Sequence, residues 1–261
     1  MKLTKDELNF FNENGYLILR NFATKKETKS ILDITSIHIK YKIEPIETEV
    51  AYHSHSKKYR TNIINYNSTK KDNKKTIRRL RQVYNRDIIF KNWMESKKIR
   101  PILKQIFKDT PVLTLAHHNS IMTKMPYSST ETNWHQDIRY WNFKNDSLLS
   151  VWLALDKENS KNGVLEFIPR SHKMKFTKKQ FDKKEYLKPD YKLNKNIIDT
   201  KVSSNLNRGD IVLFHSKLLH RANQNITKKP KISFVYTVRA LSNPPLKNTR
   251  SSKYPEVILS N

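Results

Sequence analysis

The hydrophobic pattern changes at Pro111, from the spacing of amphipathic helices to alternation in short runs. These runs end at turn sequences such as Asn162-Gly163 and Gly209-Asp210. Many short strands joined by turns are typical of a β-sandwich or a barrel. We therefore predict a mostly β fold with flanking helices, built on a double-stranded β-helix, the jelly roll of cupin-like folds. The strand-like runs cover residues 112–125, 133–141, 148–155, 164–168, 211–215 and 232–238.

The helical patterns all precede this boundary. Thr4–Glu7 and Thr24–Glu27 are capping boxes, in which a Thr hydroxyl and a Glu carboxylate satisfy amide donors at a helix start. The chain of 261 residues is short enough for a single domain. We predict that residues 1–110 support a jelly-roll core over 111–240, followed by a tail over 241–261.

Two segments interrupt the pattern, at residues 43–75 and 172–206. Both contain many Lys residues and few hydrophobic ones. We interpret the first as a long solvated excursion and the second as a lid or substrate loop.

Composition excludes several kinds of protein. The chain has no Cys, which rules out disulfide scaffolds, zinc ribbons and thiolate nucleophiles. It has three Gly, too few for a glycine-rich phosphate loop. No hydrophobic run approaches the ~20 residues of a membrane span, and the first residues are charged where a signal peptide is apolar. We expect a soluble, cytoplasmic protein without a membrane span.

The chain is strongly basic, with 51 Lys and Arg against 24 Asp and Glu and a net charge of +27. One interpretation is an anionic partner, such as nucleic acid or an acidic substrate. The other is a compositional bias in which Lys fills most exposed positions. Because the Lys residues are spread from end to end, we favour the second interpretation.

A His-x-Asp pair stands in one predicted strand, in Trp134-His135-Gln136-Asp137. Residues i and i+2 of a strand point to the same face, which predicts that the imidazole and the carboxylate lie side by side. A second His would complete a 2-His-1-carboxylate triad, the site of non-haem Fe(II) oxygenases. His215 and His220 are candidates for that ligand. The alternative is a hydrogen-bonded pair that binds no metal.

Lys231 and Ser233 lie in a later strand-like run, and the same alternation places them on one face. A cation beside a hydroxyl suits the distal carboxylate of a dicarboxylate ligand. The alternative interpretation is a solvated strand face.

Three blocks of sequence occur together with these residues. They are Trp134-His135-Gln136-Asp137 with Tyr140-Trp141; Val151–Asp156 with Asn162–Leu165 and Ile168–His172; and Gly209-Asp210 through Phe214-His215 to His220. In this order and spacing they resemble the phytanoyl-CoA dioxygenase family of Fe(II)- and 2-oxoglutarate-dependent oxygenases. The opening segment Asn14–Arg20 is similar too, so the resemblance covers both ends of the family pattern.

The resemblance implies that His135, Asp137 and His220 bind iron. It also implies a reaction in which 2-oxoglutarate and O₂ are consumed, succinate and CO₂ are released, and an unactivated C–H bond is hydroxylated. The family acts on small metabolites, and the basic lid suggests one that carries negative charge. The resemblance also implies that substrate specificity resides in the loops 43–75 and 172–206, and whether they close over the substrate is left open.

The resemblance also assigns residues to 2-oxoglutarate, the co-substrate. Lys231 corresponds to the family's anchoring Arg, Trp152 to a Trp that lines the co-substrate pocket, and Ser120 to a position that contacts the co-substrate. Two residues depart from the pattern. Lys231 keeps the charge of the Arg but lacks its bidentate fork, and Ala222 replaces a frequent Ser.

Two other functions remain as alternatives. An oxygenase acting on nucleic acid would use the positive charge to bind phosphates, but the Lys-rich segments 70–81 and 173–184 lack interleaved aromatic residues for base stacking. We therefore do not expect nucleic acid as the partner. A non-catalytic jelly-roll binding protein is the other alternative.

Five further residues near these motifs have less specific roles. We interpret His117 and His118 as ordinary strand residues. Arg139, Tyr140 and Trp141 follow the His-x-Asp pair directly, so they either face the substrate or pack as an aromatic cluster.

Overall fold

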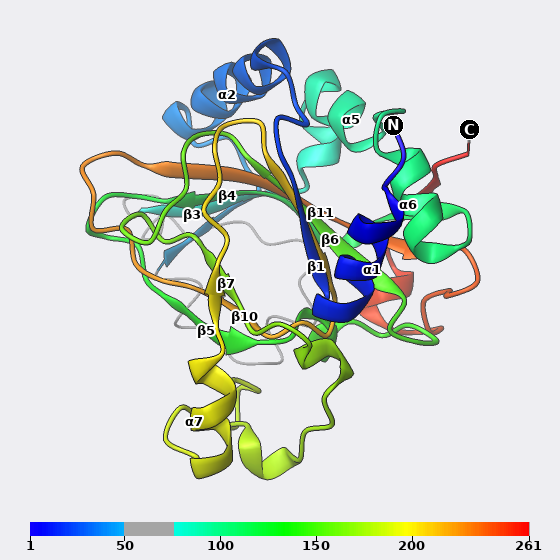
Figure 1. The fold of residues 1–261 in the computed structure, drawn as a ribbon. Helices are drawn as coiled ribbons and strands as arrows, with labels where there is room; N and C mark the ends of the chain where they lie inside the picture. Colours follow the sequence, from blue (N-terminus) through cyan, green and yellow to red (C-terminus); the bar gives the residue numbers. More distant parts are fainter. Residues whose placement is uncertain (50–75, 261) are drawn as a thin grey trace.

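A computed structural model describes residues 1–49 and 76–260. Two antiparallel sheets face each other and enclose the centre of the molecule (Figure 1). The larger sheet has eight strands in the order β1-β9-β6-β11-β4-β3-β2, with β12 paired to β4. The smaller sheet has four strands in the order β5-β10-β7-β8. This architecture confirms the predicted mostly β fold with a jelly-roll core.

The strand bounds fall close to the predicted runs over most of the second half of the chain. The strands of the larger sheet are β1 (Tyr16–Leu19), β2 (Ile46–Thr48), β3 (Ile77–Arg81), β4 (Pro111–Lys124), β6 (Leu148–Ala154), β9 (Ile211–His215), β11 (Lys231–Ala240) and β12 (Glu256–Ile258). Those of the smaller sheet are β5 (Thr132–His135), β7 (Leu165–Phe167), β8 (Val202–Ser203) and β10 (His220–Ala222).

Among the described residues, four α-helices precede β4 and one follows it. They are α1 (Lys5–Asn14), α2 (Lys25–Lys40), α5 (Ile88–Met94), α6 (Arg100–Phe107) and α7 (Lys192–Asp199). Short 3₁₀ helices are η2 (Val83–Asn85), η3 (Asp137–Tyr140), η4 (Ser171–Lys173), η5 (Lys178–Gln180) and η6 (Arg250–Ser252). Both predicted capping boxes are present, at Thr4 with Glu7 and at Thr24 with Glu27. No helix among these described residues is long and apolar enough to cross a membrane.

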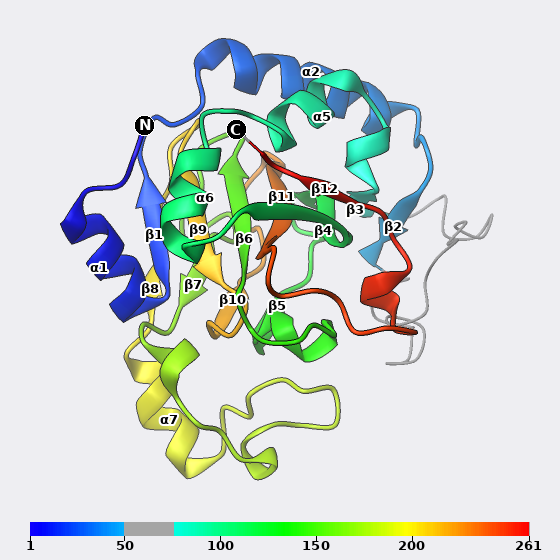
Figure 2. The same ribbon diagram turned by 90° about the vertical axis from the view of Figure 1, so that its right-hand side faces the viewer.

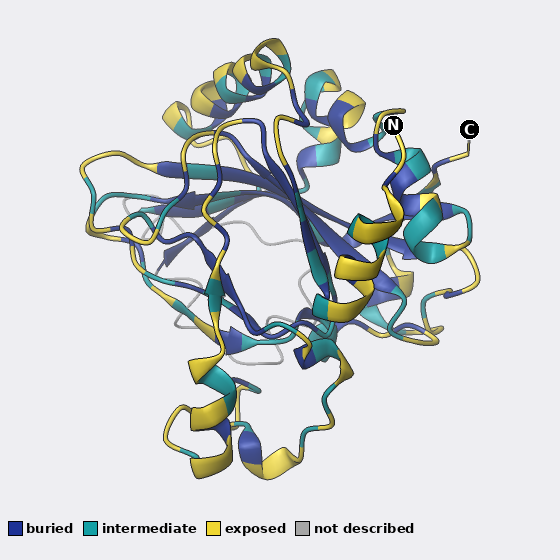
Figure 3. Ribbon diagram, in the orientation of Figure 1, coloured by how far each residue is buried: buried dark blue, intermediate teal, exposed yellow. Residues whose placement is uncertain are grey.

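The larger sheet is buried on both faces, and β6 shows how. Val151 and Leu153 point outward into a core shared with the helices, where they meet residues such as Phe90. Trp152 and Ala154 point inward and pack with Phe167 and other residues of the smaller sheet. Helices α2 and α5 cover the outer face, with their exposed sides toward solvent (Figures 2 and 3). Full burial of each large side chain contributes about 1.5–3 kcal/mol.

The two predicted loops differ from expectation. The segment from residue 43 was expected to be solvated, but Ile46–Thr48 is a buried strand paired with β3, which the sequence pattern did not predict. The rest of that loop, residues 50–75, lies outside the described residues. The loop 172–206 projects from the smaller sheet and contains α7 (Figures 1 and 2).

Candidate active site

His135, Asp137 and His220 meet at the edge of the smaller sheet. His135 ends β5 and His220 begins β10, and the two residues are direct partners across the strand pair. The Oδ1 atom of Asp137 lies 3.7 Å from Nε2 of His135 and 3.6 Å from Nε2 of His220. One ligand atom from each residue lies within 4.8 Å of the others. The structure therefore brings together all three residues expected to bind the metal.

The position of Asp137 differs in one respect from the sequence argument. The strand ends at His135, and Asp137 is the first residue of the 3₁₀ helix η3. The two side chains therefore converge through a bend after the strand, and the i, i+2 alternation of a continuous strand does not apply. His215, the other candidate ligand, instead makes a ring contact with His172 at 5.3 Å.

Backbone carbonyls orient both imidazoles. Nδ1 of His135 lies 2.7 Å from the carbonyl oxygen of Asn133, and Nδ1 of His220 lies 2.9 Å from that of Leu218. A carbonyl oxygen only accepts, so each Nδ1 carries the proton. The Nε2 atoms are then left as lone-pair donors directed at Asp137, as metal binding requires.

Burial completes this donor set. It lowers the pKa of His135 well below its usual value, with further contributions from His220 and Arg139, so its imidazole is neutral. Asp137 is almost fully buried, and its Oδ2 accepts a hydrogen bond from Ser150 at 3.2 Å. Two imidazoles and one oriented carboxylate fit the 2-His-1-carboxylate ligand set of a divalent iron.

His118 also reaches this site, contrary to its interpretation as an ordinary strand residue. Its Nε2 lies 3.4 Å from Oδ1 of Asp137, and Oγ of Ser150 lies 3.2 Å from its Nδ1. Burial lowers the pKa of His118. No local pattern predicted this contact, because His118 lies in β4 and Asp137 in the separate element η3. His117 is a buried strand residue, hydrogen-bonded to Ser251 and stacked on Trp141.

A cavity of about 180 Å³ adjoins the triad. Its lining is strongly basic: among the described residues, eight cationic side chains and one carboxylate, that of Asp137, line it. The cationic residues are Arg78, Arg79, Arg81, Lys124, Arg139, Arg221, Lys231 and Arg250. Carboxylates behind the cavity wall form ion pairs with some of these cations, including Arg78 with Glu49 at 2.9 Å and Arg79 with Glu47 at 2.7 Å.

The cavity lining includes Arg139, Tyr140 and Trp141, which also pack with aromatic neighbours. The guanidinium of Arg139 lies 4.5 Å from the ring centroid of Tyr140 and 4.3 Å from that of Tyr186. The two interpretations that the sequence left open are therefore compatible with each other.

Three of the four residues expected to bind the co-substrate converge, but on a carboxylate of the chain itself. Nζ of Lys231 lies 3.1 Å from Oε2 of Glu158. Ser233 Oγ and Trp152 Nε1 donate hydrogen bonds to Oε1 of Glu158, at 2.6 Å and 3.1 Å. Ser120 lines a smaller neighbouring cavity. The sequence analysis did not identify Glu158, and the binding roles of the four residues stay predictions.

The matches to known proteins agree with this site. The family model described as phytanoyl-CoA dioxygenase matches residues 11–233. The peroxisomal phytanoyl-CoA dioxygenase of Homo sapiens is 23% identical over 237 residues, covering 87% of this chain and 65% of that protein. A probable alpha-ketoglutarate-dependent hypophosphite dioxygenase of Stutzerimonas stutzeri is 32% identical over 108 residues, covering 40% of this chain and 36% of that protein. The chain thus spans less than two thirds of either relative.

Two solved structures share the fold. EctD from S. alaskensis, with 2-oxoglutarate and 5-hydroxyectoine, has a TM-score of 0.70 at 16% identity and covers 99% of this chain and 87% of that one. The epimerase SnoN, in complex with Fe³⁺, alpha ketoglutarate and nogalamycin RO, has a TM-score of 0.71 at 14% identity and covers 92% and 85%. Since the family model matches most of the sequence, the chain belongs to the phytanoyl-CoA dioxygenase family of iron- and 2-oxoglutarate-dependent oxygenases.

Proposed function

We propose that this protein hydroxylates an unactivated C–H bond of a small anionic metabolite, with consumption of 2-oxoglutarate and O₂ and release of succinate and CO₂. The observation that carries the anionic substrate is the basic lining of a cavity next to the metal triad. A cavity of about 180 Å³ suits a small molecule.

The chain's own residues would have the following roles in this reaction. His135, Asp137 and His220 would hold iron, which supplies O₂ activation when it is bound. Ser150 fixes the orientation of Asp137 through its hydrogen bond to Oδ2. The buried walls, including Trp141 and Trp152, exclude water from the reacting C–H bond.

An arginine cluster supports a negatively charged substrate. Arg79 and Arg81 of β3 and Arg250 of η6 line both the main cavity and its smaller neighbour. Burial and the positive charges of Arg81 and Arg79 lower the pKa of Arg250 to about 10. Holding like charges together in a poorly solvated place is costly, and an anionic ligand offsets that cost through charge-assisted hydrogen bonds.

The printed names of the relatives point the same way. One relative is named for phytanoyl-CoA and another for hypophosphite, and both compounds are anions. These names describe those proteins, and we extend to this chain only the negative charge that the two compounds share.

The test is a substrate screen with the Fe(II)-loaded protein, 2-oxoglutarate and O₂, measuring succinate release. The screen uses matched pairs in which a carboxylate or phosphonate is compared with its neutral amide or ester. We expect turnover of an anionic member to exceed that of its neutral partner by at least about tenfold, the range of a charge-assisted hydrogen bond.

Arg250→Gln should raise the KM of the active compound by a similar factor, whereas Arg170→Gln, at an exposed arginine paired with Glu13, should leave it unchanged. Equal turnover of charged and neutral partners would contradict the proposed substrate class.

A further inference from the structure

Behind the cavity lining, a buried carboxylate contacts Lys231 and Trp152, two of the residues expected to bind the co-substrate. The side chain of Glu158 is 0% exposed and that of Lys231 is 2% exposed. Glu158 accepts from Lys231, Ser233 and Trp152, and its backbone N–H and carbonyl both bond to Leu206, at 2.9 and 3.0 Å. Glu158 is therefore fixed in place and already neutralises the ammonium group of Lys231.

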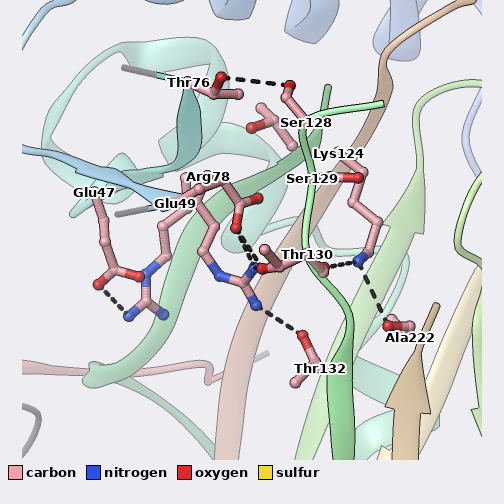
Figure 4. A network of polar contacts seen from close by, with 12 residues as sticks. Glu47, Glu49, Thr76, Arg78, Lys124, Ser128, Ser129, Thr130, Thr132 and Ala222 are labelled. Atoms are coloured by element: carbon pink, nitrogen blue, oxygen red, sulfur yellow. Dashed lines mark hydrogen bonds and ion pairs between the residues drawn. The ribbon is translucent and has the colours of Figure 1, made fainter. Parts of the chain in front are cut away.

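A second ammonium group lies beside this pair. Lys124 of β4 is the direct strand partner of Lys231 of β11, and both side chains line the cavity. Nζ of Lys124 donates to the backbone carbonyls of Thr130, at 2.8 Å, and Ala222, at 3.5 Å (Figure 4). In the described part of the chain, its ammonium group forms no ion pair with a carboxylate. Lys124 is nonetheless only 7% exposed.

The surrounding backbone holds Lys124 in this position. A Cβ atom at Gly163 would lie 2.6 Å from Cδ of Lys124 and 2.3 Å from the carbonyl oxygen of Asn223. Gly163 also has a φ of +80°, which favours glycine. The side chain of Lys124 thus occupies space that any side chain at position 163 would fill.

The cluster of Lys124, Lys231 and Glu158 has one carboxylate too few to balance its positive charges. When Lys124 is protonated, it and Lys231 contribute two positive charges and Glu158 one negative charge, while the adjacent Arg78 is paired with Glu49 at 2.9 Å (Figure 4). Buried charges are stable only when they are compensated and hydrogen-bonded. A dicarboxylate whose distal group enters here would complete the balance.

We propose that the distal carboxylate of 2-oxoglutarate is bound jointly by Lys124 and Lys231, and that Glu158 is a built-in counterion which makes Lys124 the principal source of positive charge. This inference rests on the use of 2-oxoglutarate by the proposed function. It differs from the sequence-based expectation, in which Lys231 anchors the co-substrate beside Ser233.

The charge environment of Lys124 gives the site a pH dependence. Burial, and then the charges of Lys231 and Arg78, lower the pKa of Lys124 to about 7, against smaller opposing effects of Glu49 and Glu131. Only the protonated amine attracts a carboxylate, so 2-oxoglutarate affinity should fall as the pH rises from about 6 to 8. Binding near pH 7 should be accompanied by uptake of about half a proton, since the amine is then half protonated.

The experiment is calorimetric titration of the Fe(II)-loaded protein under anaerobic conditions, in buffers of different ionisation enthalpy. The probes are 2-oxoglutarate and 2-oxopentanoate, which has a methyl group in place of the distal carboxylate. Proton uptake and pH dependence should accompany 2-oxoglutarate and be absent with 2-oxopentanoate. Equal proton uptake for the two probes would overturn the proposal without any variant.

Three variants complete the test. Lys124→Met should weaken 2-oxoglutarate binding about 30-fold, as for a lost hydrogen bond to a charged group, and leave 2-oxopentanoate binding unchanged. Glu158→Gln should strengthen 2-oxoglutarate binding about tenfold, because a like charge is removed and Lys231 is released. Lys29→Met, at an exposed lysine of α2 paired with Asp33, is the matched control and should change neither value.

Two results with the variants would also overturn the proposal. Lys124→Met with an unchanged Kd for 2-oxoglutarate would leave Lys231 as the sole anchor. A weaker affinity in Glu158→Gln would show that Glu158 only positions Lys231. Because these are binding measurements, they separate this inference from the proposed function, which fails instead if no anionic compound yields succinate.

Discussion

The metal end and the lysine end of the cavity are organised in different ways. At the metal end, each imidazole is oriented by the carbonyl oxygen two residues earlier in its own strand or loop, that of Asn133 or Leu218. At the lysine end, Lys124, Lys231 and Glu158 come from separate segments, and side-chain contacts determine their arrangement. One end relies on local backbone geometry and the other on a balance of buried charges.

This difference predicts how each end responds to substitution. A ligand oriented by its own backbone is held even when a neighbouring ligand is removed, so changes at the metal end should affect binding more than folding. A buried ion pair is costly to desolvate and stabilises only when both members are present. Changes at the lysine end should therefore affect folding as well as binding.

The largest expected effect is at the metal end. Asp137→Ala removes one of three donors and should abolish measurable Fe(II) binding and turnover, while the apo protein keeps its melting temperature within a few degrees. Metal analysis after gel filtration and a succinate assay measure these outcomes. Asp146→Ala, at a half-exposed aspartate paired with Lys217 at 3.1 Å, is the matched control and should keep full iron content. Normal iron content in Asp137→Ala would refute the triad.

The next effect is on folding, at the lysine end. Lys231→Met leaves the carboxylate of Glu158 buried without its cation and should lower the free energy of unfolding by about 3–5 kcal/mol. Denaturant unfolding measures the change, and Lys29→Met, at the exposed pair with Asp33, should change it by at most about 1 kcal/mol. Adding Glu158→Gln to Lys231→Met should restore most of the loss. Equal stability of single and double variants would remove the contrast between the two ends.

The smallest effect concerns the orientation of Asp137. Ser150→Ala removes the hydroxyl between Asp137 and His118 and should weaken Fe(II) binding about 10- to 100-fold, the usual range for a group that orients a metal ligand. Competition with a calibrated chelator measures the affinity. Ser36→Ala, at an exposed serine of α2, is the control. Unchanged iron affinity would mean that the backbone alone orients the donor set.

Regular local patterns made much of the fold predictable. Alternation predicted β6 and β9 almost to the residue, and two capping boxes predicted the starts of α1 and α2. Strand β3 was missed because the sequence around it is dominated by Arg and Lys. Its cationic side chains become tolerable only where acids such as Glu47 and Glu49 of a neighbouring segment compensate them. Residues 86–107, in which hydrophobic residues recur at helical spacing, form two helices because the chain turns between α5 and α6.

The sequence by itself determined the jelly-roll class, the family and the three residues expected to bind iron, because these follow from periodicity, turn chemistry and the order of short motifs along the chain. Only the tertiary structure decided that His118 contacts Asp137, that arginines of β3 and η6 share one cavity, and that Glu158 neutralises Lys231. Those contacts join segments far apart in the chain through flexible charged side chains. Local sequence patterns do not predict such pairings, because charged side chains pair when they are close in space, whatever their separation along the chain.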